Sequence, residues 1–469
     1  HGQIYFHDIG DYLDRKEKLD VIRNVASIDG ITAVQGWKLI TPDENNDWLD
    51  QVDRSFDQFI AIGAKKSTEV AIFENYSLGV VTNRDAWCVN SSPSKLESNI
   101  YRLISNYWRE LERKLSTGYS GDIENFVDTD PKQFSWTRAL KADLRREKRL
   151  DFGEGEIVPL IYRPFTPQWQ YYGRRLNEMV YQMPRVFPNA SEHNLVIQVS
   201  GTGARNFTVL MSNHLPCLDN VEKGQCFPLY LYEEAKSEEG LFATVDDDTG
   251  FNRRDAITDE GLAHFEAAYP GEKITKEDLF YYIYGLLHAP DYRESFKNNL
   301  AKQLPRIPAV KSFADFEAFR DAGRALGDLH ANFDSVEPYL VSFKEGDHRL
   351  INEAEDDPVK FYRVKKMKFG GKGKEKDKTT VVYNENVTIE NIPLEAYDYV
   401  VNGKPALEWV MERQVVKQDK ASGIVNDAND YANETIGDPR YPLDLFRRVI
   451  TVSLETMKIV NSLPSLDID

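Results

Sequence analysis

Three stretches of this 469-residue chain gather lysine and arginine, although the whole chain carries a formal net charge of -18. Residues 360–378 hold nine Lys/Arg against two acidic residues, residues 132–149 hold seven against two, and residues 157–205 hold five against two. Clustered cations of this kind suit contacts with phosphate groups, because the release of counterions supplies much of the affinity for nucleic acid. The acidity of the remainder predicts that such binding is confined to one face and depends strongly on salt.

The most basic of these stretches is predicted to be a β-hairpin. Residues 364–390 read VKKMKFGGKGKEKDKTTVVYNENVTIE, which is a strand, a glycine-broken lysine-rich tip and a second strand. The hairpin is either a finger that reaches for phosphates or a groove, or a solvated loop tip.

Aromatic and amide side chains interleave with the arginines of residues 166–185, which read TPQWQYYGRRLNEMVYQMPR. Amide groups can pair with the edge of adenine, and the candidates for this are Gln168, Gln170, Asn177 and Gln182. A half-buried strand pair with a polar edge explains the same pattern equally well.

A glycine-rich loop, SGTGARN at residues 200–206, is a second candidate for an anion site. Its backbone amides, together with Thr202 and Arg205, could hold a phosphate. The loop joins two predicted strands and does not open a helix, so a simple tight turn is the alternative.

Signatures of catalysis are missing from the sequence. It contains no G-x-x-x-x-G-K-[ST], G-x-S-x-G, H-R-D, H-E-x-x-H or N-P-P-Y pattern. Three cysteines without C-x-x-C spacing fit a reducing cytoplasm and argue against zinc, and His288 on an apolar helix is expected to be a packed side chain. With 76 acidic residues, pairs of carboxylates arise by accident, so a carboxylate hydrolase is only a weak alternative. No apolar run is long enough for a membrane span, and no membrane partner is expected.

The sequence pattern predicts an α+β fold to position these groups. A β-rich lobe is expected first, followed by a mainly α-helical lobe that carries the basic hairpin. Strands are expected at residues 157–165, 194–201, 206–211 and 226–233. Residues 233–260 are acidic and are expected to be a solvated connector. Proline starts and apolar spacing predict the later helices, which begin near residues 276, 290, 312, 403 and 441.

Ten phrases, in the same order along almost the whole chain, resemble the C-terminal part of type ISP restriction-modification enzymes. They are IYFHDIGDYLDRKEKL, VVTNRDAWCVN, WTRALKADLRR, YRPF, GQCFPLYLYE, ITDEGL, KEDLFYYIYGLLHAPDYR, LPRIP, VNGKPALEWVMERQ and DKASGIVNDAND. Members of this bacterial family join a nuclease, an ATP-driven translocase, a coupler, an adenine methyltransferase and a target recognition domain in one chain.

The resemblance implies a division of the chain. Residues 1–36 would be the tail of the methyltransferase domain, residues 37–250 the β-rich lobe of the target recognition domain, and residues 251–469 its mainly helical lobe. The chain by itself would then have no catalytic activity, no cofactor and no metal, whereas the parent enzyme would use S-adenosylmethionine, ATP and Mg2+. Its partners would be double-stranded DNA with a short asymmetric site and the adjoining methyltransferase domain.

The resemblance also suggests which residues contact DNA. GVVTNRDAWCVN is similar to the junction between methyltransferase and recognition domains in related enzymes, which implies a backbone or phosphate role for Thr82, Asn83 and Arg84. The expected phosphate contacts are Arg84, Arg163, Arg205, Lys372 and Lys374, and Thr202 is a further expected DNA contact. The expected base readers are Arg174, Arg175, Arg185, Lys366 and Lys368. The alternative function is an acidic docking module without its own DNA specificity.

Overall fold

The computed structural model describes residues 2–10, 13–43, 46–49, 51–64, 69–235, 250–346, 354, 356–371 and 376–468. It divides into two compact units, His1–Phe56 and Asp57–Asp469. The assignment of residues 1–36 to the end of a methyltransferase domain, and the boundary at residue 250, stay predictions.

The first unit pairs a small sheet with two helices. Asp14 caps the first helix by accepting a hydrogen bond from the Glu17 backbone, while the Glu17 side chain accepts one from the Asp14 backbone. The elements are β1 (Ile4–Phe6), α1 (Arg15–Val25), α2 (Ile28–Ala33) and β2 (Lys38–Ile40), with β1 antiparallel to β2.

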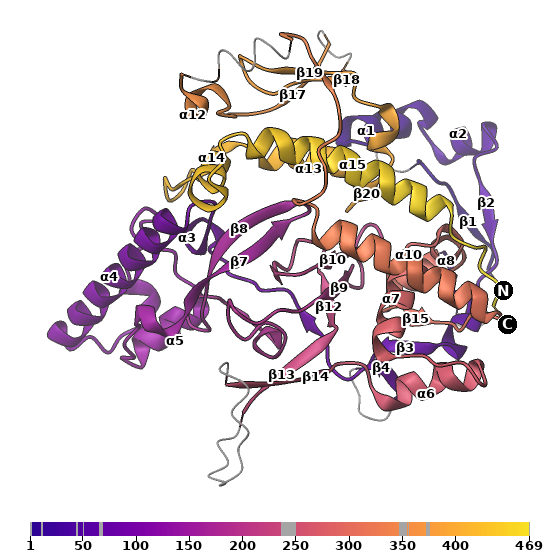
Figure 1. The fold of residues 1–469 in the computed structure, drawn as a ribbon, viewed down its shortest axis with the longest axis horizontal. Coiled ribbons are helices and arrows are strands. Elements are labelled where there is room, and N and C mark those ends of the chain that lie inside the picture. Colours follow the sequence, from indigo (N-terminus) through magenta and orange to yellow (C-terminus); the bar gives the residue numbers. More distant parts are fainter. Residues whose placement is uncertain are drawn as a thin grey trace. The chain divides into compact units, whose positions relative to one another are not determined.

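Two four-stranded sheets lie at the centre of the second unit (Figure 1). All four residues of β9 and of β10 are buried, including the polar Gln198 and Ser212. One sheet has the order β11 (Leu215–Pro216), β7 (Glu156–Arg163), β8 (Thr166–Tyr172) and β6 (Val89–Asn90). The other has the order β10 (Val209–Ser212), β9 (Val196–Val199), β12 (Gln225–Pro228) and β5 (Ser77–Leu78).

Further sheets lie around these two. One has the order β15 (Arg306–Ile307), β3 (Ile60–Gly63) and β4 (Ala71–Phe73), and another β16 (Ser342–Phe343), β19 (Thr388–Glu390), β18 (Asp377–Val382) and β17 (Lys368–Gly370). Antiparallel pairs are β13 (Tyr230–Glu234) with β14 (Phe251–Asp255), β20 (Val400–Val401) with β21 (Lys404–Pro405), and β22 (Val416–Gln418) with β23 (Val425–Asp427).

The predicted basic hairpin is confirmed as β17 and β18, which pair antiparallel. The acidic connector expected at residues 233–260 is partly wrong, because residues 251–255 form β14 and pair in register with β13. Residues 236–249 lie outside the described residues.

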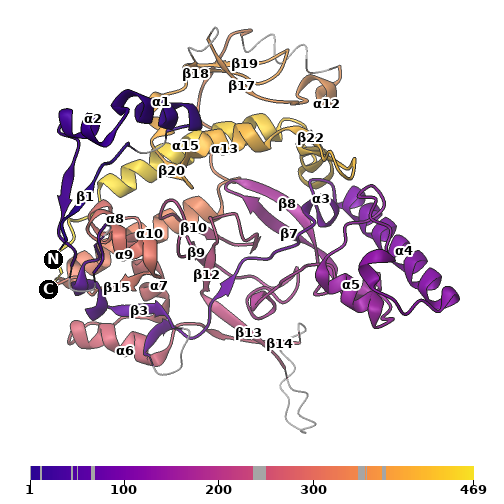
Figure 2. The same cartoon turned by 180° about the vertical axis from the view of Figure 1, so that it is seen from behind.

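Helices flank the sheets on several sides (Figure 2). They are α3 (Asp85–Cys88), α4 (Pro93–Thr117), α5 (Arg138–Arg145), α6 (Asp259–Ala268), α7 (Lys276–Leu286), α8 (Pro290–Ser295), α9 (Lys297–Lys302), α10 (Phe313–Ala331), α12 (Pro358–Phe361), α13 (Ala406–Arg413), α14 (Ala428–Asp430) and α15 (Tyr441–Asn461). Single turns of 3-10 helix are η1 (Arg54–Gln58), η2 (Ile123–Asn125), η3 (Phe152–Glu154), η4 (Met183–Arg185) and η5 (Leu394–Tyr397), and η6 (Tyr431–Ile436) is a π-helix.

Several sequence-based expectations about these helices are confirmed and one is wrong. The helices expected to begin near residues 276, 312, 403 and 441 are α7, α10, α13 and α15. Ser312 caps α10 by accepting a hydrogen bond from the Asp315 backbone. The single helix expected after Pro290 is two short helices, α8 and α9, which meet at Phe296. Phe296 is buried and packs against Phe59 and Tyr292, so packing fixes the break.

Helices α7 and α10 cross at very short range. A Cβ added at Gly285 would overlap the carbonyl oxygen of Phe319, and one at Gly323 would overlap that of Tyr281. Only glycine at both positions lets the two backbones approach this closely. Among the described residues, no helix has the length and apolar character that a bilayer span requires. The α+β class with a β-hairpin in the helical part is confirmed.

Candidate nucleic-acid interface

The turn that contains Thr82, Asn83 and Arg84 is held by its own side chains. The Thr82 hydroxyl donates a short hydrogen bond to Asp85 and accepts one from the Arg84 backbone at 3.1 Å. Asn83 has a φ of 52°, in the left-handed region that asparagine tolerates, and its side chain is exposed. The turn therefore presents Asn83 to solvent, whereas Thr82 is buried.

Arg84, an expected phosphate contact, points inward. Only 4% of the residue is exposed, and its three guanidinium nitrogens have no hydrogen-bond partner among the described residues. Burial lowers the pKa of Arg84, while the charge of nearby Glu178 acts in the opposite direction. In this structure the guanidinium does not reach the surface on which a phosphate would lie.

Three of the other expected arginines are engaged in contacts within the protein. Arg163 donates to the Tyr162 carbonyl at 2.7 Å and lies over the Tyr162 ring. Arg185 pairs with Glu233 at 2.9 Å, in a network that Arg254 completes. Arg175 pairs with two carboxylates, as described next.

Arg175 joins two of the basic stretches. Its Nε donates to Asp143 at 3.1 Å and its Nη1 to Glu154 at 2.9 Å, and Nη1 also donates to the Arg149 carbonyl. The loop that follows β8 is thereby fixed to the end of α5. Arg174, the neighbour of Arg175, is exposed at this junction.

Exposed arginines flank this junction, and we call them the α5 arginine surface: Arg145, Arg146, Arg149 and Arg174. None of the four side chains has an ion-pair partner among the described residues. Arg149 lies 5.9 Å from the Trp108 ring centre. The expected site residues include Arg174 but not the other three, although their stretch was recognised as basic. Cations at the C-terminal end of a helix also stabilise the helix dipole. Their presence at the end of α5 therefore does not by itself indicate a DNA contact.

The loop at residues 200–206 is a hydrogen-bonded turn. The Gly201 and Gly203 amides donate to the carbonyls of Glu222 and Ala301, and the Arg205 amide donates to the Glu222 carboxylate at 3.1 Å. These amides already donate to acceptors within the protein, which favours the tight-turn alternative. The side chains of Thr202 and Arg205 are nevertheless exposed on the loop.

The basic hairpin exposes part of its predicted set. Lys366 and Lys368 are exposed, and no ion pair is recorded for either among the described residues. Lys378 pairs with Glu408 at 3.1 Å. Lys372 and Lys374 lie outside the described residues. Figure 1 places β17 and α5 on different parts of the second unit.

The four candidate amides divide between internal and accessible positions. Gln170 is buried and donates to Asn177 at 2.6 Å, and Asn177 donates to the carbonyls of Tyr171 and Gly173. Gln170 and Asn177 therefore hold the β8 turn and are unavailable to a base edge. Gln182 is exposed, and Gln168 lines a pocket.

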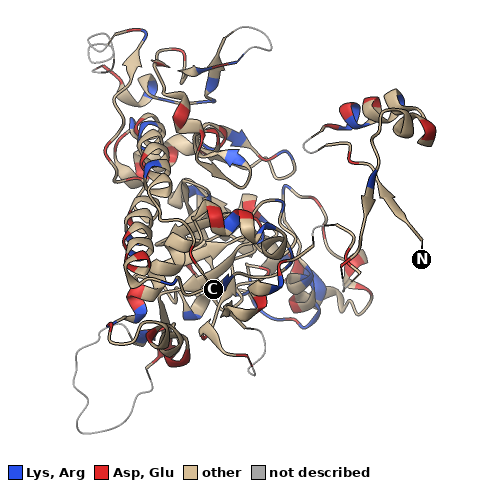
Figure 3. Ribbon diagram, turned by 90° about the vertical axis from the view of Figure 1, so that its right-hand side faces the viewer, with Lys and Arg blue, Asp and Glu red and all other residues tan. Residues whose placement is uncertain are grey.

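Basic and acidic residues lie close together along many of the described elements. Figure 3 shows Lys and Arg positions alternating with Asp and Glu positions along many elements. Within the described ranges, no three His, Cys, Asp or Glu side chains converge as metal ligands do. Cys88, Cys217 and Cys226 are buried free thiols, and burial raises the pKa of Cys88 to about 12. His288 is buried, and its Nδ1 lies 2.9 Å from the Tyr284 carbonyl.

Comparison with known proteins identifies the family to which the chain belongs. Residues 71–445 match the family of type ISP C-terminal specificity domains. The chain belongs to this family, and the resemblance noted in the sequence is confirmed. No curated protein sequence matches the chain.

Three solved structures resemble the chain over its whole length. The ATP-dependent type ISP restriction-modification enzyme LlaBIII bound to DNA is 33% identical with a TM-score of 0.81, and the chain covers 28% of it. A nuclease-deletion mutant of the type ISP enzyme LlaGI with a DNA substrate mimic is 34% identical with a TM-score of 0.80, and 39% of it is covered. The DrdV–DNA complex is 31% identical with a TM-score of 0.74, and 43% of it is covered. Of the chain itself, the matches cover 100%, 100% and 99%. The chain thus spans less than half the length of these relatives.

Proposed function

We propose that this chain recognises a short, asymmetric site in double-stranded DNA and thereby directs a larger type ISP restriction-modification enzyme to that site. The observation that carries the proposal is membership of a specificity-domain family, together with full-length similarity to structures that contain DNA. A specificity domain supplies DNA binding, and the sequence of this chain contains no Walker A, nucleophile-elbow, kinase, zinc-protease or N-P-P-Y pattern.

Phosphate contacts would come from the α5 arginine surface, where Arg145, Arg146 and Arg149 are exposed without ion-pair partners among the described residues. Phosphate contacts set the position of a protein on a duplex, and base contacts set its specificity. Arg174 lies beside these arginines and is the base-reading candidate there, because an arginine fork can donate two hydrogen bonds to guanine. Lys366, Lys368 and Arg205 are further exposed candidates.

The reactions of the parent enzyme belong to the same proposal. The adjoining methyltransferase domain would modify an adenine within the selected site, and other domains would cut DNA in an ATP-dependent manner. S-adenosylmethionine, ATP and Mg2+ would then bind elsewhere in the parent chain, and this chain would bind none of them.

Selection of bound duplexes from a randomised library tests the proposal. The purified chain is incubated with the library at low and at moderate salt, and the bound fraction is sequenced. We expect enrichment of one short non-palindromic motif that contains an adenine. Failure to bind any duplex at low salt, with stable binding to a separately made methyltransferase domain, would replace the proposal with the docking module.

A further inference from the structure

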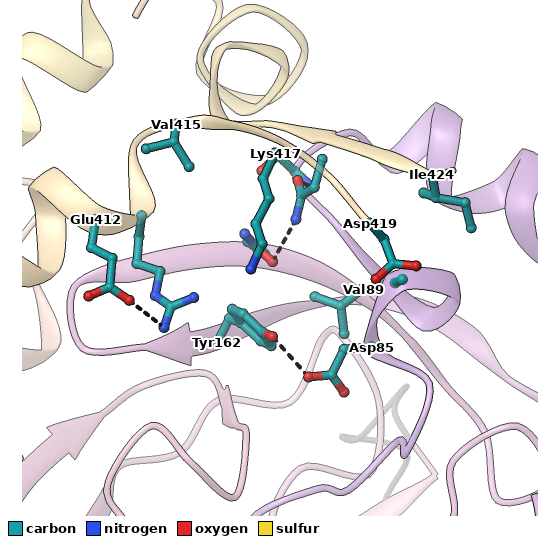
Figure 4. A pocket seen from close by; sticks show the side chains of 13 residues that line it. Asp85, Val89, Tyr162, Glu412, Val415, Lys417, Asp419 and Ile424 are labelled. Atoms are coloured by element: carbon teal, nitrogen blue, oxygen red, sulfur yellow. Dashed lines mark hydrogen bonds and ion pairs between the residues drawn. The ribbon is translucent and has the colours of Figure 1, made fainter. Parts of the chain in front are cut away.

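A pocket of about 220 Å³ lies within the second unit, where four separate parts of the chain meet (Figure 4). The start of α3, the β7–β8 pair, the end of α13 and the β22–β23 hairpin each contribute lining residues. Of the residues singled out in the sequence, Gln168 lines the pocket, and α3 follows the Thr82–Arg84 turn directly.

An oriented hydroxyl forms one side of this pocket. The Tyr162 hydroxyl donates to Asp85 at 2.9 Å, and the other Asp85 oxygen accepts the Thr82 hydroxyl. Burial raises the pKa of Tyr162, so the phenol keeps its proton and continues to donate to Asp85. The free lone pairs of the phenol oxygen make it a fixed hydrogen-bond acceptor for a ligand.

Amide and hydroxyl donors form another part of the lining. The Asn426 side chain accepts a hydrogen bond from the Ser91 backbone amide at 2.9 Å and donates one to the Gln168 side-chain oxygen at 3.4 Å. These bonds fix the Gln168 side chain, which is only 7% exposed. The Gln168 Nε2 and the Ser91 hydroxyl have no recorded hydrogen-bond partner in the described part of the chain, and both residues line the pocket.

Apolar side chains and two cations complete the lining. Figure 4 shows Val89, Val415 and Ile424 around the pocket, with Lys417 extending into it from β22. Arg413 pairs with Glu412 at 3.0 Å, whereas no ion pair is recorded for Lys417 in the described ranges. Aliphatic side chains of this kind can pack against the two faces of a planar ring, and pockets for an extruded base hold it between aromatic or apolar side chains.

The size and charge of the pocket restrict its ligand. A cavity of about 150 Å³ can hold benzene, and sites for larger organic ligands are typically about 300–1,000 Å³. The observed 220 Å³ therefore suits one heterocyclic ring system. Three carboxylates against two cations in the lining disfavour a phosphate, whereas mixed donors and acceptors suit a neutral heterocycle.

We propose that this pocket binds a single nucleobase, with the base between the apolar side chains, its polar edge on Gln168, Ser91 and Tyr162, and its phosphates outside near Lys417. The inference rests on the proposed function, because bound DNA would be the source of the base. The base would belong to a nucleotide that has left the stack of the bound duplex. A free nucleoside presents the same chemistry and is the other source.

Binding experiments with a fluorescent base analogue test the inference. The probes are 2-aminopurine riboside, a duplex with one unpaired 2-aminopurine, and the fully paired duplex of the same sequence. The variants are Val415→Trp, which fills the pocket, and Gln168→Met, which removes its amide donor at similar length. Lys417→Ala and Lys420→Ala form a matched pair, because both lysines are exposed on one hairpin and only Lys417 lines the pocket.

We expect the unpaired duplex to bind about tenfold more tightly than the paired one, because only its 2-aminopurine can enter the pocket without first breaking a base pair. Val415→Trp and Gln168→Met should abolish this preference, Lys417→Ala should reduce it, and Lys420→Ala should leave it unchanged. The affinity for the paired duplex should be equal in the wild type and Val415→Trp. Thermal unfolding of each variant checks its fold. Lys417 is exposed, so Lys417→Ala tests the pocket even if Val415→Trp or Gln168→Met fails to fold.

Other outcomes separate this inference from the proposed function. If the riboside binds saturably and Val415→Trp abolishes this binding, but the unpaired duplex has no advantage, the pocket takes free nucleosides. If the riboside binds and no duplex does, the pocket assignment stands and the proposed function fails. A preference that persists in Val415→Trp, Gln168→Met and Lys417→Ala, or the absence of both preference and riboside binding, overturns the inference.

Discussion

Arg175 donates to Asp143 at 3.1 Å and so connects the loop after β8 to α5, two segments that are separate in the sequence. This ion pair places the exposed Arg174 next to the arginines at the end of α5. Two consecutive arginines therefore have different roles: Arg175 holds the surface together, and Arg174 is part of it.

Arg174 and Arg175 should respond differently to the same substitution. Arg175→Ala removes its bonds to Asp143 and Glu154 and should lower the free energy of unfolding by about 1–3 kcal/mol, since the bonds are charge-assisted and half-buried. Arg174→Ala should leave stability unchanged and weaken binding to the selected DNA site by about 1–3 kcal/mol. Urea unfolding and binding titrations measure the two effects. Equal losses of binding without loss of stability in both variants would contradict this division.

The salt dependence of binding should identify the phosphate contacts. Arg145→Ala and Arg149→Ala should each weaken binding to every duplex. Each should also make the negative slope of log K against log salt shallower by roughly 0.9. Lys458→Ala is the control, because Lys458 is exposed on α15 and pairs with Glu455. Binding curves at several salt concentrations give the slopes. Unchanged slopes would remove the α5 arginine surface from the interface.

The buried His330 should make the fold sensitive to acid. Its two ring nitrogens lie 2.6 Å from the Tyr284 hydroxyl and 2.8 Å from the Thr456 hydroxyl, and burial lowers its pKa from 6.5 to about 3, with a contribution from Arg293. The unfolded chain takes up a proton below pH 6.5 while the folded chain does not, so stability is fully present above that pH and falls as pH decreases toward 3.

The contribution of this histidine is measurable as a slope. Between pH 6.5 and 3, His330 should account for about 1.4 kcal/mol of lost stability per pH unit. His330→Gln removes this titration, so the free energy of unfolding of the variant should depend less steeply on pH, even though its stability near pH 7 is lower. Identical slopes for the two proteins would show that His330 is protonated in the folded state.

The crossing of α7 and α10 should not tolerate a methyl group. Gly323→Ala gains helix propensity but forces the added Cβ against the Tyr281 carbonyl, and we expect a net loss of about 1–3 kcal/mol in unfolding free energy. Ala325→Gly, at an exposed position of α10, is the comparison and should cost about 1 kcal/mol through propensity alone. A neutral or stabilising Gly323→Ala would mean that the helices can separate without cost.

The sequence by itself determined the elements whose signals are local. The strands near residues 157 and 194, the cap at Ser312 and the hairpin at residues 364–390 follow from alternation, side-chain caps and glycine breaks that act within a few residues. The long helix α4 carried such signals as well, with Ser92 as its cap and buried apolar residues at helical spacing from Leu96 to Leu111, but it was not among the predicted helices.

Only the tertiary structure decided which charged and amide side chains are accessible. Arg163, Arg175 and Arg185 are partnered by groups from other elements, and Arg84 is buried, whereas Arg174 and Arg205 remain exposed. The nucleobase pocket likewise brings together Asp85, Tyr162 and Asn426, which are far apart in the chain. Composition records that a charge or an amide exists, but its availability depends on long-range partners that only folding supplies.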